Sequence, residues 1–172
     1  MILFLWFARP RWWSLLFGTL LLALGETIRL AAVCYIGGSC RTRGERPGKR
    51  LVREGPFELV RNPLYLGNFL IVLGVATMVA RWELFLIAVL LFWAQYLPIV
   101  YWEERTLLEQ FGEAYRQYAA SVPRFFPRRW RWKRPTERAP MPLLSALFLE
   151  RRTLLAEGLT LVAFLLRWTL EG

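Results

Sequence analysis

The sequence predicts an all-α fold, a polytopic membrane bundle of three spanning helices with a candidate fourth span and a cytoplasmic amphipathic helix. Of its 172 residues 56% are hydrophobic, and nine are Trp. The apolar residues gather in runs long enough to cross a bilayer. A soluble domain with this composition would expose large apolar patches. The net charge of +10 comes from basic residues that flank the apolar runs.

The first span is predicted from Trp12 to Val33, with two Trp at its start that suit a membrane interface. Glu26 and Arg29 lie within it, one helical turn apart, so they can pair on one face. Ionisable side chains inside a span are costly and face each other or a site. The pair is therefore either a structural ion pair near the membrane boundary or a wall of a functional cavity.

The second and third spans are predicted over Pro63–Ala80 and Leu84–Trp102, joined by a tight turn at residues 81–83. Asn62 is a favoured N-cap, and Pro63 fits the first helical position because it lacks an N–H. Each span is about 27–29 Å long, near the thickness of the bilayer core. The two spans therefore form an antiparallel hairpin whose open ends meet at one membrane face.

Helical spacing of apolar residues continues over Glu103–Ala120, where polar residues alternate with them, and predicts an amphipathic helix. Gly112 weakens this helix but need not break it. The following segment Arg128–Arg134 interleaves Arg and Trp, which suits a headgroup interface. Gly67 and Gly74 lie seven residues apart on one face of the second span and would allow a close backbone approach.

The C-terminal region offers two readings. Met141–Leu149 is apolar, Glu150–Arg152 interrupts it, and Thr153–Leu170 is again mostly apolar. This last stretch is either a fourth span or an interfacial helix, since Glu157 and Arg167 would be awkward in lipid. The domain division expected is a membrane core over 1–140 and a C-terminal apolar part over 141–172.

The distribution of charge predicts the topology. Basic residues fill the segments 34–62 and 103–140, whereas the turn at 81–83 has a single one. The positive-inside rule then places both basic segments in the cytoplasm and the N-terminus outside. We expect anionic lipids rather than nucleic acid as partners, because the basic clusters flank apolar spans. The dominance of Arg over Lys hints at a bacterial source, and hence at the inner membrane.

Cysteine and histidine usage limits the chemistry. Cys34 and Cys40 match no metal motif, there is no His, and we expect reduced thiols and no metal site. Without His, proton transfer must use a carboxylate, a Tyr or water. We also expect no cleavable signal peptide, because the residues 9–11 interrupt the short apolar start.

The predicted hairpin places the run Arg61–Gly67 beside the run Tyr101–Arg105. Free N–H groups at the helix start and the Arg61 guanidinium can bind a carboxylate. Glu103 and Glu104 offer negative charge to a cation, and the rings of Tyr65, Trp102 and Tyr115 offer π faces. A zwitterionic amino acid with an added cation fits this set. An ordinary helix cap and a charged span boundary would use the same residues.

Two motifs carry a family resemblance. Gly55–Phe57 and Val60–Gly67 form the first, and the second is Glu103-Glu104 followed by Leu107, Phe111-Gly112, Tyr115, Tyr118 and Val122–Phe125. Together they resemble the isoprenylcysteine carboxyl methyltransferase and phospholipid methyltransferase superfamily. The resemblance covers roughly residues 25–127, with its motifs in segments 51–70 and 101–127. Glu26, Arg29 and the residues 39–44 also look like bacterial members.

The resemblance implies a membrane enzyme that binds S-adenosylmethionine at the cytoplasmic ends of the hairpin and takes a lipid-like methyl acceptor from the bilayer. Carried over by position, the residues expected to bind the cofactor are Arg61, Asn62, Tyr65, Leu66, Gly67, Glu103, Glu104 and Tyr115. Arg61 and Glu104 are the expected catalytic residues. Many members have His where this chain has Asn62, which cannot act as a base.

The acceptor stays open between two chemistries. A prenylcysteine or other isoprenoid carboxylate is already a nucleophile at neutral pH, whereas a phospholipid amine must first lose a proton. Two other functions also stay open: a non-enzymatic membrane scaffold, and an NADPH-dependent reductase of related helical architecture. Binding of S-adenosylmethionine or NADPH would separate all three.

Overall fold

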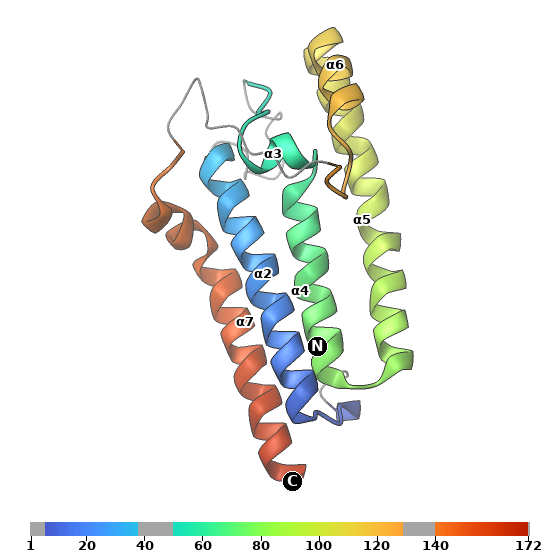
Figure 1. Ribbon diagram of the computed structural model, residues 1–172, viewed down its shortest axis with the longest axis vertical. Coiled ribbons are helices and arrows are strands. Elements are labelled where there is room, and N and C mark those ends of the chain that lie inside the picture. The colour runs from blue at the N-terminus through green and yellow to red at the C-terminus, as the bar shows by residue number, and fades with distance from the viewer. Residues whose placement is uncertain (1–5, 38–49, 129–139, 172) are drawn as a thin grey trace.

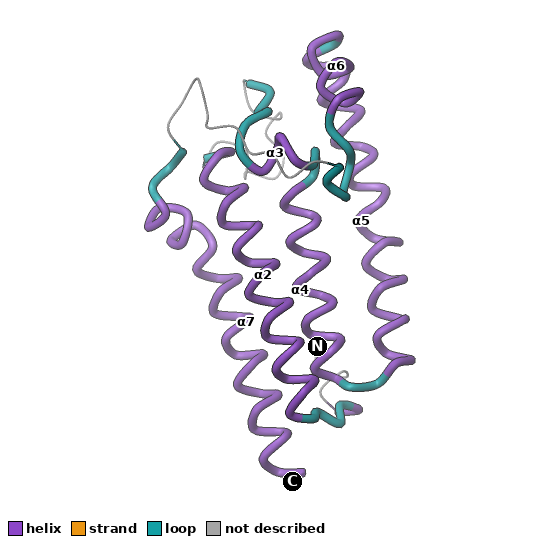
Figure 2. Tube along the Cα trace, in the orientation of Figure 1, coloured by secondary structure: helices purple, strands orange, loops and turns teal. Residues whose placement is uncertain are grey.

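The computed structural model describes residues 6–37, 50–128 and 140–171. Within these ranges the regular structure is all helical (Figures 1 and 2), which confirms the predicted fold class. Four long helices, α7, α2, α4 and α5, lie side by side in that order (Figure 1), and each contacts its neighbour in the row. The helices are α2 (Trp12–Ile36), α3 (Pro56–Leu59), α4 (Pro63–Val79), α5 (Trp82–Phe111), α6 (Glu113–Ser121) and α7 (Leu143–Glu171).

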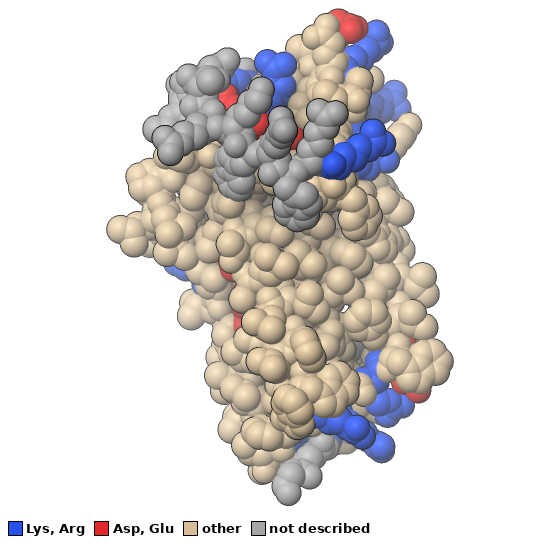
Figure 3. Space-filling model, viewed as in Figure 1, with Lys and Arg blue, Asp and Glu red and all other residues tan. Residues whose placement is uncertain are grey.

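Three of the described helices are long and apolar enough to cross a membrane: residues 12–36, 82–111 and 143–170. α4 is also apolar but has 17 residues, which makes it about 26 Å long. The predicted fourth span is therefore a full-length helix, and the predicted second span is the short one. On the face shown in Figure 3, the middle of the bundle is mostly uncharged, with a few acidic and basic atoms at one edge, as expected of an integral membrane protein.

The predicted third span and the start of the predicted amphipathic helix form one helix, because α5 continues past Trp102 without a break to Phe111. The residues after Trp102 favour helix, and nothing among them ends one. The chain breaks instead at Gly112, where φ is 53°, a conformation that Gly adopts at little cost. The amphipathic helix expected over 103–120 is thus divided between the last turns of α5 and the short α6.

The charged run Glu150–Arg152 interrupts the apolar pattern but not the helix, because α7 is one continuous helix from Leu143. Glu150 does not face solvent. It is instead fully buried and forms an ion pair with Arg29 of α2, 2.8 Å from oxygen to nitrogen. A paired carboxylate inside the bundle does not force the helix out of the membrane.

The contact between α2 and α4 is built on two pairs of glycines. A Cβ on Gly25 would lie 2.7 Å from the carbonyl oxygen of Gly67, and one on Gly74 would lie 2.6 Å from that of Gly18. The close approach predicted for Gly67 and Gly74 is therefore confirmed. Their partners on α2 are also seven residues apart, so the two antiparallel helices pack backbone to backbone.

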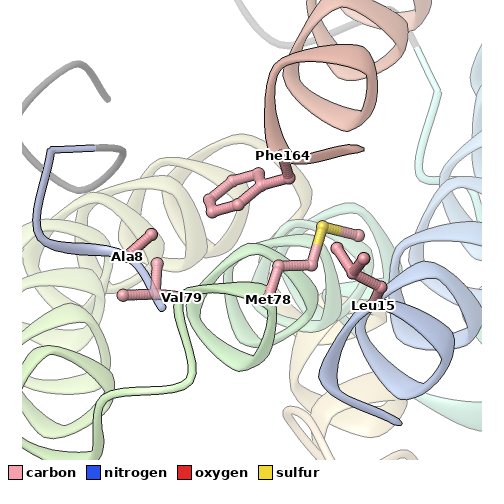
Figure 4. Packing of buried hydrophobic residues seen from close by; sticks show 5 residues of the cluster. All are labelled: Ala8, Leu15, Met78, Val79 and Phe164. Carbon is pink, nitrogen blue, oxygen red and sulfur yellow. The ribbon is translucent and has the colours of Figure 1, made fainter. Parts of the chain in front are cut away.

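A small apolar cluster closes the end of the bundle at which α4 leads into α5 (Figure 4). Ala8, Met78, Val79 and Phe164 are each fully buried there, against Leu15. The backbone N–H of Arg9 donates to the carbonyl of Val79 at 3.0 Å. Three separate segments are held together at this end. The opposite end, where α2 ends and α4 begins, is called the motif end below.

Candidate functional site

The site at the motif end begins with a short backbone pairing. The N–H of Arg61 donates to the carbonyl of Pro123 at 2.8 Å, and that of Asn62 to the carbonyl of Arg124 at 3.2 Å. The break at Gly112 makes this possible, because the chain turns back after α6 toward the start of α4 (Figure 1). The two sequence motifs are therefore in direct contact.

Glu104 is the centre of the polar contacts in this site, and only 7% of it is exposed. Its Oε1 accepts a hydrogen bond from Asn62 Nδ2 at 2.9 Å. Arg124 donates from Nε to Oε1 at 3.1 Å and from Nη2 to Oε2 at 2.7 Å, a two-pronged contact. Arg61 Nη1 lies 3.6 Å from Oε2. Both carboxylate oxygens are thus engaged by the protein, and two guanidinium groups balance the charge.

Asn62 and Pro63 start α4 as predicted, but the capping role expected of the Asn62 side chain is wrong. Its amide turns to Glu104 and makes no cap hydrogen bond to the helix. The first helical bond runs from the N–H of Leu66 to the carbonyl of Asn62 at 3.1 Å. Because the Asn62 side chain makes no cap hydrogen bond, the first N–H groups of this helix can donate to an anionic partner.

Tyr65 and Glu103 join α4 to α5 at the same level, where the Tyr65 hydroxyl donates to Glu103 Oε1 at 2.7 Å. The Tyr65 ring meets the edge of Tyr96, with centroids 5.4 Å apart. Aromatic contacts continue from there between the two helices and reach the segment after α6. This aromatic wall consists of Tyr65, Phe69, Phe92, Trp93, Tyr96 and Phe125.

Two tyrosines of α6 close the site from the side. The Tyr118 hydroxyl donates to the carbonyl of Phe57 at 2.8 Å. Tyr115 is only 4% exposed, and its hydroxyl makes no hydrogen bond within the described part of the chain. Burial raises the pKa of Tyr115, and the charge of Glu104 raises it further. Burial also raises the pKa of Tyr118. Both phenols therefore stay neutral at physiological pH and can donate hydrogen bonds.

The structure brings most of the predicted site residues together: Arg61, Asn62, Tyr65, Glu103, Glu104 and Tyr115. Gly67 instead faces α2, where a Cβ on it would lie 2.6 Å from Arg29 Cγ. Leu66 is half-buried, and its backbone N–H is used in the first helical bond of α4, to the carbonyl of Asn62. Trp102, expected to offer a π face, is 65% exposed. It lies outside the polar contacts of the site.

Arg124 is the site residue that sequence reasoning missed. Its run, from Val122 to Phe125, belongs to the second motif, but the sequence gives no sign that it returns to Glu104. The available signal was electrostatic. Two adjacent carboxylates at a membrane boundary require cations nearby, and Arg61 supplies only one.

Other expectations fall on parts of the chain away from this site. Glu26 and Arg29 do form the predicted pair, with Arg29 Nε 3.1 Å from Glu26 Oε2. They lie inside the bundle, so the structural reading of this pair fits better than the cavity wall. Cys40, most of the basic loop and the Arg–Trp segment beyond residue 128 lie outside the described residues.

An open hollow of about 430 Å³ lies beside the tyrosines on the side of α6 and α3. Its lining is mostly polar and consists of Arg53, Glu58, Gln117, Tyr118, Ser121 and Val122. Tyr118 is shared between this hollow and the contacts around Tyr115. The hollow therefore adjoins the site through Tyr118, whereas Arg61, Glu103 and Tyr115 are not part of its lining.

Comparison with known proteins identifies the family. Residues 13–114 match the phospholipid methyltransferase family. The chain belongs to this family. The matched stretch runs from α2 to the start of α6, and it contains both halves of the Tyr65–Glu103 and Asn62–Glu104 contacts. α7 lies outside it.

Individual relatives agree with this assignment. The chain is 34% identical over 129 residues to the cobalt-zinc-cadmium resistance protein CzcN of Cupriavidus metallidurans, covering 71% of this chain and 56% of that protein. It is 32% identical over 126 residues to protein-S-isoprenylcysteine O-methyltransferase B of Arabidopsis thaliana, covering 69% of this chain and 62% of that enzyme.

A solved structure shows the same fold. It is that of a eukaryotic intramembrane Ras methyltransferase, isoprenylcysteine carboxyl methyltransferase, with a TM-score of 0.62 and 25% identity. The comparison covers 70% of this chain and 44% of that one. The chain thus spans roughly half the length of the relatives it matches.

Proposed function

We propose that this protein is an S-adenosylmethionine-dependent methyltransferase that acts at the cytoplasmic membrane face on a lipid-like acceptor. One observation carries the proposal. In a chain of the phospholipid methyltransferase family, α4 and α5 bring Arg61, Tyr65 and Glu103 to the end of an apolar bundle, beside the buried hydroxyl of Tyr115. Arg61 is complementary to the carboxylate of the cofactor, and Glu103 is complementary to one of its cationic groups.

The fit to the cofactor rests on two buried groups that lie beside each other. Arg61 Nε and the Tyr115 hydroxyl are both buried, and Tyr115 interacts with Arg61. We propose that Arg61 and the first N–H groups of α4 hold the carboxylate, and that Glu103 faces the ammonium or sulfonium. The Tyr65 ring lies close enough to Glu103 to add a π face for the cation.

When bound, S-adenosylmethionine supplies an electrophilic methyl group, which the acceptor takes with its lone pair as the sulfur–carbon bond breaks. The protein's part is to align the two at about 3–3.5 Å and to exclude water. Glu104 positions Arg61 and Arg124, because its oxygens are already engaged. Its expected direct role in catalysis is thereby replaced, in this proposal, by one in holding the site together.

The bases available in the site decide which class of methyl acceptor it can use. Asn62 cannot take a proton, and Glu104 is occupied by cations. A carboxylate acceptor needs no base, and the relatives of Arabidopsis thaliana are named as isoprenylcysteine O-methyltransferases. An amine acceptor would have to give its proton to Glu103, the carboxylate with fewer protein partners. We favour an isoprenoid-type carboxylate over a phospholipid amine on this ground.

Two relatives bear the names of metal-resistance proteins. We carry no metal-binding role over to this chain. Across the described ranges, no three His, Cys, Asp or Glu side chains come together in a group that could hold a metal ion.

Calorimetric titration of the purified protein with S-adenosylmethionine, and separately with NADPH, tests the proposal. We expect saturable binding of the first and none of the second. Transfer of a labelled methyl group to membrane lipid extracts or to a farnesylated cysteine then identifies the acceptor. Binding of NADPH alone would indicate a reductase, and binding of neither would indicate a scaffold. Either outcome overturns the proposal.

A further inference from the structure

A charged network inside the bundle connects α7 to the first turns of α4. Its centre is Arg29 of α2, whose side chain is 12% exposed. Arg29 Nη2 lies 2.8 Å from Glu150 Oε2 of α7, and Nη1 donates to Asn68 Oδ1 of α4. Nε faces Glu26 on the same helix at 3.1 Å. The Arg29 guanidinium therefore connects α2, α4 and α7, because each of its three nitrogens contacts a different side chain.

The network lies directly beneath the candidate site. Arg29 packs over Gly67, where a Cβ would come within 2.6 Å of Arg29 Cγ. Asn68 follows Tyr65 by three residues, so both stand on neighbouring turns of one helix face. Tyr65 in turn donates to Glu103. Side-chain contacts thus run from Glu150 through Arg29 to Asn68. From there the helical backbone of α4 connects Asn68 to Tyr65, three residues earlier, and so to the proposed cofactor-binding pair.

α7 is held to the bundle at both ends of this network. The N–H of Met141, just before the helix, donates to the carbonyl of Cys34 at 2.7 Å. Far below, Phe164 is fully buried in the apolar cluster with Met78 and Val79 (Figure 4). Glu150 lies between these two attachments and is itself fully buried. It is the point at which α7 can act on the polar part of the protein.

We propose that Glu150 is a positioning residue for methyl transfer, although it lies outside the stretch that matches the family. Its carboxylate holds the Arg29 guanidinium against Asn68 and Gly67, and thereby fixes the turn of α4 that carries Tyr65. Without that charge, the guanidinium would be held by Glu26, which it already contacts and which is hydrogen-bonded to Glu157 of α7. Asn68 then loses its donor, and the start of α4 is free to shift.

This inference rests on the proposed function, because its readout is binding of S-adenosylmethionine. The variant is Glu150→Gln in the full chain, which keeps the size of the side chain and removes its charge. We expect the dissociation constant of the cofactor to rise about two- to thirtyfold, the range typical of residues that act through a packed network. Asn68→Ala should also raise the dissociation constant of the cofactor. The double variant should raise it by less than the product of the two single-variant factors.

Phe164→Ala is the matched control, because it loosens α7 at the end remote from the site. It should lower the unfolding midpoint at least as much as Glu150→Gln does, yet leave cofactor affinity unchanged. Equal loss of affinity in both variants would mean that Glu150 acts only through stability, and would overturn the inference. Unchanged affinity in Glu150→Gln would overturn it as well.

The two proposals fail in distinguishable ways. If the unaltered protein does not bind S-adenosylmethionine, the proposed function is wrong. If it binds and Glu150→Gln binds equally well, only the positioning role is wrong. Should Glu150→Gln fail to fold, Asn68→Ala decides alone, since its side chain is half-buried and its loss leaves the Arg29–Glu150 pair intact. Unchanged affinity in that variant then overturns the inference.

Discussion

Arg124 reaches back to Glu104 across the break at Gly112 and grips both of its carboxylate oxygens, with Nη2 2.7 Å from Oε2. The contact holds the segment after α6 against the start of α4, where the backbones are already paired. Besides stabilising the fold, this salt bridge holds the segment after α6 in place as one wall of the site. α4 and α5 alone do not provide that wall.

Glu104→Gln should destabilise the protein more than Arg124→Gln. The first change leaves two guanidinium groups facing each other in a buried site and costs about 3 kcal/mol. The Arg124 side chain is 44% exposed, so solvent screens its charge, and its loss costs about 1–2 kcal/mol. Thermal unfolding in detergent measures both. Arg105→Gln removes the exposed pair with Glu109 and serves as the control. A larger loss of stability in Arg124→Gln than in Glu104→Gln would contradict the central role of Glu104.

Glu103→Gln should weaken binding of S-adenosylmethionine about ten- to hundredfold, because it removes one charge-assisted contact worth about 1.5–3 kcal/mol. Stability should change less, since the Tyr65 hydroxyl can still donate to the amide oxygen. Calorimetry measures the affinity, and Glu109→Gln on the same helix is the matched control. If affinity is the same in both variants, Glu103 is only a boundary residue of the span.

Gly67→Ala should destabilise the bundle by about 1–3 kcal/mol, the usual cost of overpacking. The added methyl group would meet the backbone oxygen of Gly25 at 2.7 Å, and backbone cannot move aside as a side chain can. Gly158→Ala on α7 is the control, because nothing lies within 4 Å of the new atom. We expect that change to be neutral or slightly stabilising. Equal unfolding midpoints for the two variants would argue against the close α2–α4 contact.

The parts of the fold that sequence predicts well are those set by local rules. The apolar runs locate the long helices, because length and hydropathy decide which segments can cross a bilayer. Asn62 and Pro63 mark the start of α4 correctly, since a Pro at the first helical position needs no partner. The hairpin argument then brings the Arg61 and Glu103 regions together, as the structure shows.

What the sequence could not predict are contacts between distant segments. The continuity of α5 past Trp102 is a local property, since nothing ends the helix before Gly112. The burial of Glu150 was not predicted because its partner, Arg29, lies 121 residues away. Arg124 was missed for the same reason. A charge buried by tertiary pairing has the same local sequence as a charge exposed to water, so periodicity cannot distinguish them.

The topology predicted from charge places Arg81 outside and the motif end in the cytoplasm. Arg81 lies in the turn between α4 and α5, at the opposite end of the bundle from Arg53. In a chain with Cys34 and Cys40 replaced by Ser, Arg81→Cys should react with an impermeant thiol reagent in intact cells. Arg53→Cys should react only after permeabilisation. The reverse pattern would invert the topology.

The last prediction concerns how the acceptor arrives. The proposed site lies at the start of α4, at the level where we expect the membrane boundary, and the aromatic wall between α4 and α5 leads up to it. A lipid-like acceptor can place its head near Glu103 and Tyr65 while its tail stays beside Trp93 and Phe69. We therefore expect the acceptor to approach sideways from the membrane, whereas the polar cofactor approaches from the side of the open hollow.

Acceptors with one head group and tails of increasing length test this idea, at equal mole fraction in mixed micelles so that partitioning is held constant. The kcat/KM should rise with each methylene group that contacts the protein, by up to about fourfold for a fully buried one. Trp93→Ala should flatten this dependence, because it removes part of the wall. Leu159→Ala, on the exposed outer face of α7, should leave it unchanged. A tail-free acceptor that reacts with the kcat/KM of the lipid would show that the bilayer plays no part in delivery. If Trp93→Ala and Leu159→Ala change the dependence of kcat/KM on tail length equally, the tail lies on the outer surface rather than between the helices.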